Sequence, residues 1–403
     1  MSRVIVTNTR AVLRNECLDD ATVVCDQGRI VDVLDRRVST STDGTTTFVD
    51  ARGAVCLPGL VDTHSDGLER ERFPRPGVDL GARFTIRSFE GRVRAAGITT
   101  MFHGIGFEDD EKYHRSIQLA NEWSDELESY QASGKSLVDH RILYRLDARD
   151  PYGFDALVDR LPRRWDDGAL PLVSFEDHTP GQGQYTDRTA FERYIVGTQQ
   201  LTEEEARRRV DQLIAERDEL LENRERALPW LVTEAQGRRL RLMAHDPATT
   251  AESEEAHRWH ASIAEFPTTL EAARRAKELG LRTVCGAPNV LRGRSHSGNV
   301  SARELIALGL CDGLASDYLP STMLGAVAVL VDSAVCDLAT AVRLVTSGPA
   351  ETVGLTDRGA IEVGLRADLV LARFDGSLAT VESVLRAEDG LRGEERSLEL
   401  QTA

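Results

Sequence analysis

The residues with the clearest chemical potential follow a short apolar run near the start of the chain. Residues 56–63 read Cys-Leu-Pro-Gly-Leu-Val-Asp-Thr, and His64, Ser65 and Asp66 come directly after them. An apolar run closed by polar residues is typical of a buried parallel strand. Side chains two positions apart lie on the same side of a strand. We therefore expect His64 and Asp66 to face one point and to offer a divalent ion an imidazole and a carboxylate.

Acidic residues and histidines also end most of the later predicted strands. Strand patterns alternate with helical ones, and they cover 98–103, 141–147, 171–178, 241–245, 262–266, 283–286 and 313–317. With the first run they make eight, the number that a (β/α)8 TIM barrel needs, and the C-terminal ends of barrel strands meet at one face. The candidate metal ligands gathered in this way are His64, Asp66, Asp147, Asp177, His178, His245, Glu265 and Asp317.

Each of these residues also has an ordinary structural explanation. An acid at a strand end often caps the next helix, and a single histidine is often a packing residue. Their recurrence on most strands favours a site. The ligand types predict one or two divalent ions, Zn²⁺ or Mn²⁺, which would make hydroxide available from water at neutral pH.

The composition narrows the class of protein. The chain has 403 residues and a net charge of −17, which argues against a nucleic-acid partner. No apolar stretch approaches the roughly 18 residues of a membrane span, and no signal peptide is apparent, so we expect a cytoplasmic protein without a membrane partner. The six cysteines are widely spaced, which indicates neither a zinc knuckle nor a disulfide framework.

Both ends of the chain read as short strands and turns instead of βα units. We predict an N-terminal β module over 1–55, the barrel over 56–345, and a C-terminal β segment with a charged tail over 346–403. Residues 198–239 are predicted to be a charged helical insertion in the barrel. We interpret its charges as a solvated helix face with i,i+4 pairs.

Residues 58–64, Pro-Gly-Leu-Val-Asp-Thr-His, resemble the first-strand signature of the amidohydrolase superfamily. That resemblance implies a metal-dependent hydrolase on a distorted TIM barrel, with both chain ends forming one small β-sandwich. The usual second histidine of the signature is replaced by Asp66. By the same resemblance, Asp317 binds metal and accepts the proton of the attacking water, with His178 and His245 completing the catalytic set.

Three longer stretches, at 177–185, 286–299 and 316–321, closely resemble the α-D-ribose 1-methylphosphonate 5-triphosphate diphosphatases of the carbon-phosphorus lyase pathway. This implies hydrolysis of a phosphorylated sugar, from the 5-triphosphate to the 5-phosphate, with release of pyrophosphate. The His-Ser-Asp-Gly-Leu-Glu stretch at 64–69 resembles the His-Thr-Asp-Asn-Leu-Glu of that family. Gly67, and Asp147 where glutamate is expected, are departures that leave room for a shifted substrate.

A triphosphate needs donors that neutralise and orient it, and the segment 292–299 after the seventh strand is rich in them. The seventh and eighth loops of a TIM barrel are a frequent phosphate site. The alternative is an ordinary hydrophilic connection. The candidate substrate-binding residues are Arg145, Gln184, Asn289, Arg292, Ser295, His296 and Asn299.

Two other functions are compatible with the residues. An amidohydrolase that cleaves a C–N bond, such as an N-acyl deacetylase or a cyclic amidase, needs the same activated water, although an amide substrate has no need of several arginines. The second alternative is a barrel that has lost catalysis and serves as a binding scaffold. Association with a second copy of the chain, or with other proteins of the phosphonate pathway, stays open.

Overall fold

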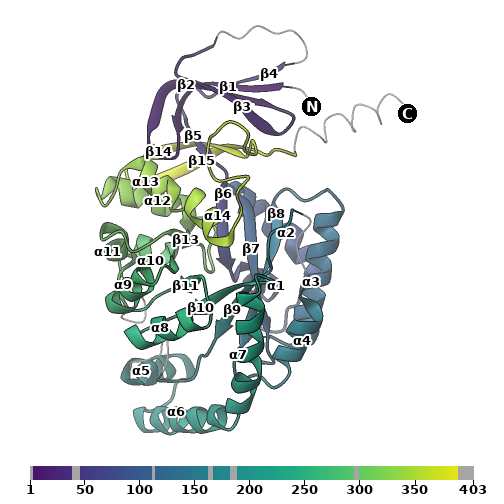
Figure 1. Ribbon diagram of the computed structural model, residues 1–403, viewed down its shortest axis with the longest axis vertical. Coiled ribbons are helices and arrows are strands. Elements are labelled where there is room, and N and C mark those ends of the chain that lie inside the picture. The colour runs from purple at the N-terminus through teal and green to yellow at the C-terminus, as the bar shows by residue number, and fades with distance from the viewer. Residues whose placement is uncertain are drawn as a thin grey trace.

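The computed structural model describes residues 3–38, 46–110, 114–161, 167–181, 188–294 and 299–388. It divides into a β sheet built from the two chain ends and a larger α/β body below it in the view of Figure 1. Among the predicted substrate contacts, Gln184, Ser295 and His296 lie outside the described residues.

The larger body is built on eight parallel strands that follow one another in chain order. They are β6 (Leu60–Ser65), β7 (Ile98–Phe107), β8 (Asp139–Asp147), β9 (Leu172–Glu176), β10 (Arg241–His245), β11 (Ile263–Glu265), β12 (Arg282–Gly286) and β13 (Gly313–Ala315). A parallel bridge between Ser65 and Asp317 joins the end of the last strand to the first. The predicted TIM barrel is thereby confirmed.

One apolar side chain from every barrel strand meets in the interior. These residues form one cluster: Val61, Phe102, Leu143, Leu172, Met243, Ile263, Val284 and Ala315. Because strand side chains alternate, the residue two positions further on points into the same space, one layer nearer the C-terminal face. That next layer includes Arg145, Ser174, His245, Glu265 and Asp317. The polar residues therefore lie directly above the apolar layer, on the side of the C-terminal strand ends.

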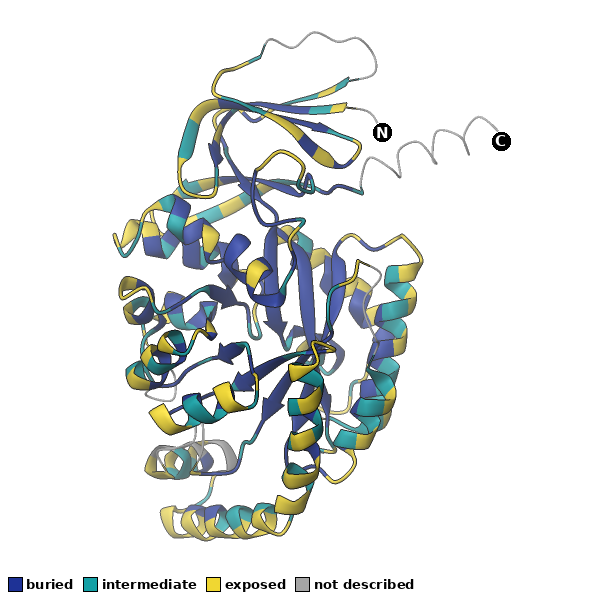
Figure 2. Ribbon diagram, in the orientation of Figure 1, coloured by how far each residue is buried: buried dark blue, intermediate teal, exposed yellow. Residues whose placement is uncertain are grey.

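Helices cover the outside of the barrel, with buried inner faces and exposed outer faces (Figure 2). Helix α2 (Ala82–Ala95) buries Ile86, Phe89 and Val93, which recur at the i, i+3 and i+7 spacing of one helix face. The remaining barrel-side helices are α1 (Gly67–Arg72), α3 (Ile117–Ala132), α4 (Gly153–Arg160), α8 (Thr250–Arg258), α9 (Leu270–Glu278), α10 (Ala287–Arg292), α11 (Ala302–Ala307), α12 (Thr322–Asp332), α13 (Leu338–Arg343) and α14 (Ser347–Val353). No helix in the described part of the chain is both long enough and apolar enough to cross a membrane.

The two chain ends share one mixed sheet of seven strands, ordered β15-β14-β5-β1-β2-β3, with β4 also paired to β1. Its strands are β1 (Arg3–Val12), β2 (Cys17–Asp26), β3 (Arg29–Leu34), β4 (Thr46–Asp50), β5 (Val55–Pro58), β14 (Leu369–Asp375) and β15 (Leu378–Leu385). The antiparallel pairing of β14 with β5 unites the two ends, as the sequence predicted.

The predicted first strand is two strands in two sheets, and Gly59 separates them. β5 pairs within the end sheet, whereas β6 pairs with β7 in the barrel. A Cβ atom at Gly59 would lie 2.2 Å from the Thr99 hydroxyl oxygen and 2.9 Å from the Asp368 Cβ, so the two layers meet there too closely for any side chain.

The charged insertion forms three helices, α5 (Arg188–Gln199), α6 (Glu203–Asp218) and α7 (Leu221–Gln236). Ala227 and Leu231 of α7 join the main core, so α7 is one of the helices that cover the barrel. Helices α5 and α6 instead form a small apolar cluster of their own around Ile195, Ala206 and Val210. Figure 1 shows α6 at the far end of the molecule from the end sheet.

Candidate active site

A cavity of about 490 Å³ opens at the C-terminal ends of the barrel strands. Its walls include the strand ends, helix α10 after β12, and residues of α5 and α6. The sequence-predicted residues that line it are His64, Asp66, Arg145, Asp147, His178, His245, Asn289, Arg292, Asn299 and Asp317. Residues separated by as much as 253 positions in the sequence (64 to 317) therefore share one chamber.

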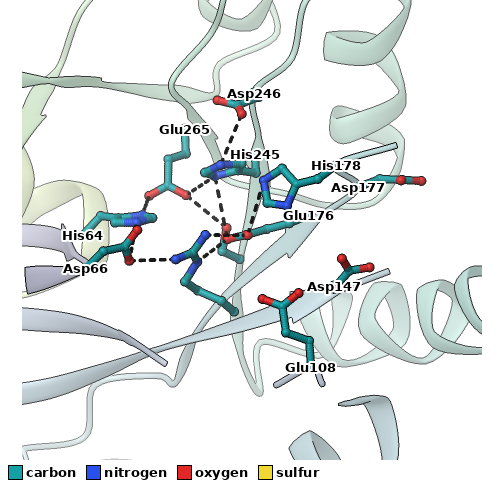
Figure 3. A network of polar contacts seen from close by, with 12 residues as sticks. His64, Asp66, Glu108, Asp147, Glu176, Asp177, His178, His245, Asp246 and Glu265 are labelled. Carbon is teal, nitrogen blue, oxygen red and sulfur yellow. Dashed lines mark hydrogen bonds and ion pairs between the residues drawn. The ribbon is translucent and has the colours of Figure 1, made fainter. Parts of the chain in front are cut away.

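Glu265 lies between His64 and His245, two histidines that line this chamber (Figure 3). Its Oε1 atom is 2.8 Å from His64 Nδ1, and its Oε2 atom is 2.9 Å from His245 Nδ1. The Ser174 hydroxyl donates to the same Oε2 atom at 3.0 Å. Glu265 is wholly buried.

Three overlapping groups of side chains have ligand atoms close enough together to hold a metal ion. They are His64 with His245 and Glu265, then Glu176 with His178 and His245, and finally His64 with Asp66 and Asp317. His64 and His245 each belong to two groups, so the three are parts of one cluster. Imidazole and carboxylate are ligands that Zn²⁺ and Mn²⁺ both accept.

Arg145 joins the two sides of the cluster beneath these ligands. It forms a two-pronged ion pair with Glu176, at 2.8 and 2.9 Å, and a third bond to Asp66 at 2.7 Å. Gly104 makes this possible, because a Cβ atom there would lie 2.7 Å from the Asp66 carboxylate and 2.9 Å from Arg145 Cδ. Arg145 is thus engaged by two protein carboxylates through three hydrogen bonds.

The backbone bends sharply where the strands deliver these residues. Asp246, Phe266 and Asp317, each just past the end of its strand, have positive φ angles of 53°, 51° and 58°. Left-handed conformations in residues other than glycine cost of order 1–3 kcal/mol and cluster at functional sites. The Asp317 amide donates to the His64 carbonyl at 3.0 Å, which holds the first and last strand ends together.

The buried charges shift the pKa values of the cluster in opposite directions. Burial, reinforced by the Asp66 carboxylate, raises the pKa of Asp317 to about 6. Burial lowers the pKa of His178 to about 4. It also acts to lower the pKa of His245, but the carboxylates of Asp246, Glu176 and Glu265 outweigh it and raise that pKa to about 9. The raised pKa values of Asp317 and His245 indicate that the carboxylates around these two residues favour positive charge there.

The residues present fit a divalent cation. Asp246 follows His245, and its Oδ2 atom is buried without a hydrogen-bond partner among the described residues, 3.3 Å from His245 Nε2. A buried carboxylate oxygen without a partner is costly unless a cation or water satisfies it. The donor set is one that a metal would complete.

Two predicted ligands stand apart from the three groups. Asp147 accepts from both terminal nitrogens of Arg217, at 3.0 and 2.8 Å. Asp177 accepts from Arg149 at 2.9 Å and points away from the histidines in Figure 3. Neither aspartate belongs to a metal-binding group among the described residues, and both are bound by arginines.

Glu176 takes the position in the cluster that the sequence analysis assigned to Asp177. Leu172 faces the barrel interior, and alternation then directs Ser174 and Glu176 inward and Asp177 outward. That spacing was a usable signal in the sequence. No signal in the sequence indicated the arginine contacts. Arg217 belongs to α6, and the charges of that helix were interpreted as a solvated face.

The described residues Arg292, Arg294 and Asn299 of the predicted phosphate-binding segment line the cavity. Arg292, at the end of α10, is exposed, lines the cavity and forms no ion pair with the described residues. Arg209 of α6 lines it as well. The Asn289 amide is engaged with the backbone, donating to Val300 at 3.3 Å and accepting from Ala302 at 3.1 Å, so this side chain anchors the segment.

Comparison with known proteins agrees with this geometry. The model of the amidohydrolase family matches residues 184–387. The chain is also 34% identical over 389 residues to the α-D-ribose 1-methylphosphonate 5-triphosphate diphosphatase of Escherichia coli K12, covering 95% of this chain and 98% of that protein. The chain belongs to the amidohydrolase family. This amidohydrolase is therefore a hydrolase, and its resemblance to the diphosphatases, recognised in its motifs, is confirmed over nearly its whole length.

Solved structures share the fold of this amidohydrolase at low sequence identity. A β-aspartyl dipeptidase from Fervidobacterium islandicum AW-1 is 15% identical, with a TM-score of 0.60 and coverage of 96% of both chains. A 5-methylcytosine deaminase from Klebsiella pneumoniae is 14% identical, with a TM-score of 0.61 and coverage of 95% of this chain and 96% of that one. At such identities the likeness concerns the fold alone.

Proposed function

We propose that this amidohydrolase is a metal-dependent diphosphatase that converts a ribose 5-triphosphate, substituted at the 1-position by a phosphonate, to the 5-phosphate and pyrophosphate. The observation that carries the proposal is the pairing, in one cavity, of a histidine and carboxylate cluster with the arginines Arg209 and Arg292. The 34% identity to the E. coli diphosphatase, which spans both features, supports it.

The candidate metal ligands and Arg145 have separate roles in this proposal. A divalent ion bound there would lower the pKa of a water molecule and neutralise phosphoryl charge. The side chains that would hold it are His64, Asp66, Glu176, His178, His245 and Asp317. Arg145 fixes Asp66 and Glu176 through its three ion-pair contacts, so two of these carboxylates are oriented before substrate arrives.

Asp317 is the proposed general base. It takes a proton from the water that attacks phosphorus, the bridging P–O bond between the first and second phosphates breaks, and pyrophosphate leaves. Asp317 suits this task because it lines the cavity beside His64 and Asp66 at the junction of the first and last strands. Positioning and charge neutralisation supply most of the rate enhancement in phosphoryl transfer.

The decisive experiment is a paired assay. The purified protein, loaded in turn with Zn²⁺ and with Mn²⁺, is incubated with ribose 5-triphosphates and separately with simple N-acyl amino acids. Pyrophosphate release from the first set is the expected result. Release of free amine from the second set, without pyrophosphate from the first, would replace the proposal with C–N bond hydrolysis. No turnover in either set, with metal bound, would favour a scaffold.

Arg292 tests the triphosphate part of the proposal. Arg292→Ala should raise KM for a ribose 5-triphosphate by roughly tenfold, the loss of one charge-assisted contact, and change KM for a monophosphate analogue much less. Arg274→Ala, which removes an exposed arginine of α9 outside the cavity wall, is the matched control. Equal effects of Arg292→Ala on both compounds would discard Arg292 as a triphosphate contact.

A further inference from the structure

Glu265 was predicted from the sequence to be a metal ligand, but its contacts indicate a different task. Each of its two carboxylate oxygens already lies at hydrogen-bond distance from a ring nitrogen, His64 Nδ1 at 2.8 Å and His245 Nδ1 at 2.9 Å. The Ser174 hydroxyl occupies a further acceptor position at 3.0 Å. The residue has no exposed surface.

The chemistry of these contacts defines the two imidazole rings. An ionised carboxylate can only accept hydrogen bonds, so the nitrogen that faces it must carry the proton. Both His64 and His245 therefore have Nδ1–H, and in the neutral ring Nε2 is left with a free lone pair. One carboxylate sets the tautomer and the orientation of both rings.

The nitrogens left free point toward other acids. His64 Nε2 lies 3.3 Å from Asp66 Oδ1, in the group that includes Asp317. His245 Nε2 lies 3.3 Å from Asp246 Oδ2, the buried oxygen without a hydrogen-bond partner among the described residues. A cation bound between each Nε2 atom and its neighbouring carboxylate could accept the nitrogen lone pair and the carboxylate oxygen together.

We infer that Glu265 is a positioning residue and not a ligand: it holds His64 and His245 through their Nδ1–H groups so that each binds a divalent ion through Nε2. Histidine ligands usually donate their second ring N–H to a carboxylate or carbonyl, which fixes the ring. Here a single buried carboxylate serves two of them. The inference rests on the proposed function only in requiring that a divalent ion binds.

Proton NMR of the Co²⁺-loaded protein tests this without any substrate. Paramagnetic Co²⁺ shifts the protons of its ligands, and selective ¹⁵N labelling at histidine Nδ1 identifies protons on that atom. Two slowly exchanging, shifted Nδ1–H signals are expected, since the rings of His64 and His245 are buried, whereas the His178 ring is 26% exposed and exchanges faster. Absence of these two signals, or failure to bind Co²⁺, overturns the inference.

A variant supplies the second measurement. Glu265→Gln keeps the shape of the side chain but has only one oxygen, so it can accept from one ring and not from both. It should lose or move at least one of the two signals and weaken Co²⁺ affinity about 10- to 100-fold. Glu108→Gln, a pocket-lining acid whose ion-pair partner is Arg115, should change neither. A Glu265→Gln protein with both signals and unchanged affinity contradicts the positioning role.

These readouts do not depend on hydrolysis. Both signals in a protein that releases no pyrophosphate would overturn the proposed function and leave the role of Glu265 intact. Pyrophosphate release without the signals would do the reverse.

Discussion

At the scale of single residues, Asp317 combines a constrained backbone with a reactive position. Its φ angle of 58° turns the chain just beyond β13, and its amide is bound to the His64 carbonyl. The carboxylate is thereby held in the group with His64 and Asp66. Such a conformation persists only where the surrounding contacts over-determine it.

Asp317→Asn should therefore lower kcat by roughly 10²- to 10⁴-fold, since the amide cannot accept the proton of the attacking water. The fold should survive, because asparagine tolerates positive φ and has nearly the same volume. Steady-state kinetics with circular dichroism checks both points. Near wild-type kcat in a folded, metal-loaded variant would remove Asp317 from the mechanism.

At the scale of elements, Arg217 joins α6 to the ends of two barrel strands. Arg217 pairs with Asp147 through both terminal nitrogens, contacts Asp177 at 3.3 Å, and donates from Nε to the Thr179 hydroxyl at 2.8 Å. Asp147 is only 7% exposed, so its charge depends on this partner. The helix that carries part of the cavity wall is thus held at the ends of β8 and β9.

Arg217→Ala should loosen α6 and cost about 3 kcal/mol, because it leaves a buried carboxylate without its ion pair. Hydrogen exchange should accelerate over α6, and KM for a triphosphate should rise. Arg208→Ala, on the exposed side of the same helix, should leave both quantities unchanged. Unaltered exchange in α6 of the Arg217 variant would show that other contacts hold this helix.

The junction between the two sheets is the second feature at this scale. Gly59→Ala should destabilise the protein by about 1–3 kcal/mol, since the new methyl group would overlap Thr99. Gly91→Ala is a matched control within α2, where nothing lies within 4 Å of the new methyl group, and it should be neutral or slightly stabilising. Urea unfolding measures both; equal midpoints for the two variants would refute the tight junction.

At the scale of the whole molecule, Arg358 ties the C-terminal part of the chain to the start of the barrel strands. It follows α14 and bonds to the Thr100 hydroxyl at 2.9 Å and to Asp139. Arg141 also binds Asp139, at 3.0 and 3.2 Å. Burial acts to raise the pKa of Asp139, but the guanidinium groups of Arg141 and Arg358 outweigh it and lower that pKa well below the ordinary range.

The lowered pKa of Asp139 makes the stability of the fold depend on pH in a definite direction. A carboxyl whose pKa is lower in the folded state stabilises the fold above its unfolded value, near 4, and the contribution disappears as pH falls toward the folded value. Asp139→Asn should therefore cost about 3–5 kcal/mol at pH 7 and progressively less below pH 4. Denaturant unfolding between pH 7 and pH 3 measures this. The exposed Asp19→Asn is the control, and a pH-independent deficit for Asp139→Asn would contradict the argument.

Local patterns in the sequence were enough to predict the architecture. Period-two and helical patterns predicted eight βα units and the strand-bearing ends, because the interior of a parallel barrel demands apolar strands and each helix needs one apolar face. The same patterns located His64, Asp66, His178, His245 and Asp317 at strand ends, where the topology of a barrel brings side chains together.

Which side chains contact one another was decided only by the tertiary structure. Nothing local distinguishes Arg217, which enters the site, from Arg208, which faces solvent on the same helix. Nor could the sequence show that Asp147 and Asp177 are held by arginines, or that Glu265 lies between two histidines. Periodicity fixes which way a side chain points within its own element, whereas its neighbour depends on how distant elements pack, and that information is spread over the whole chain.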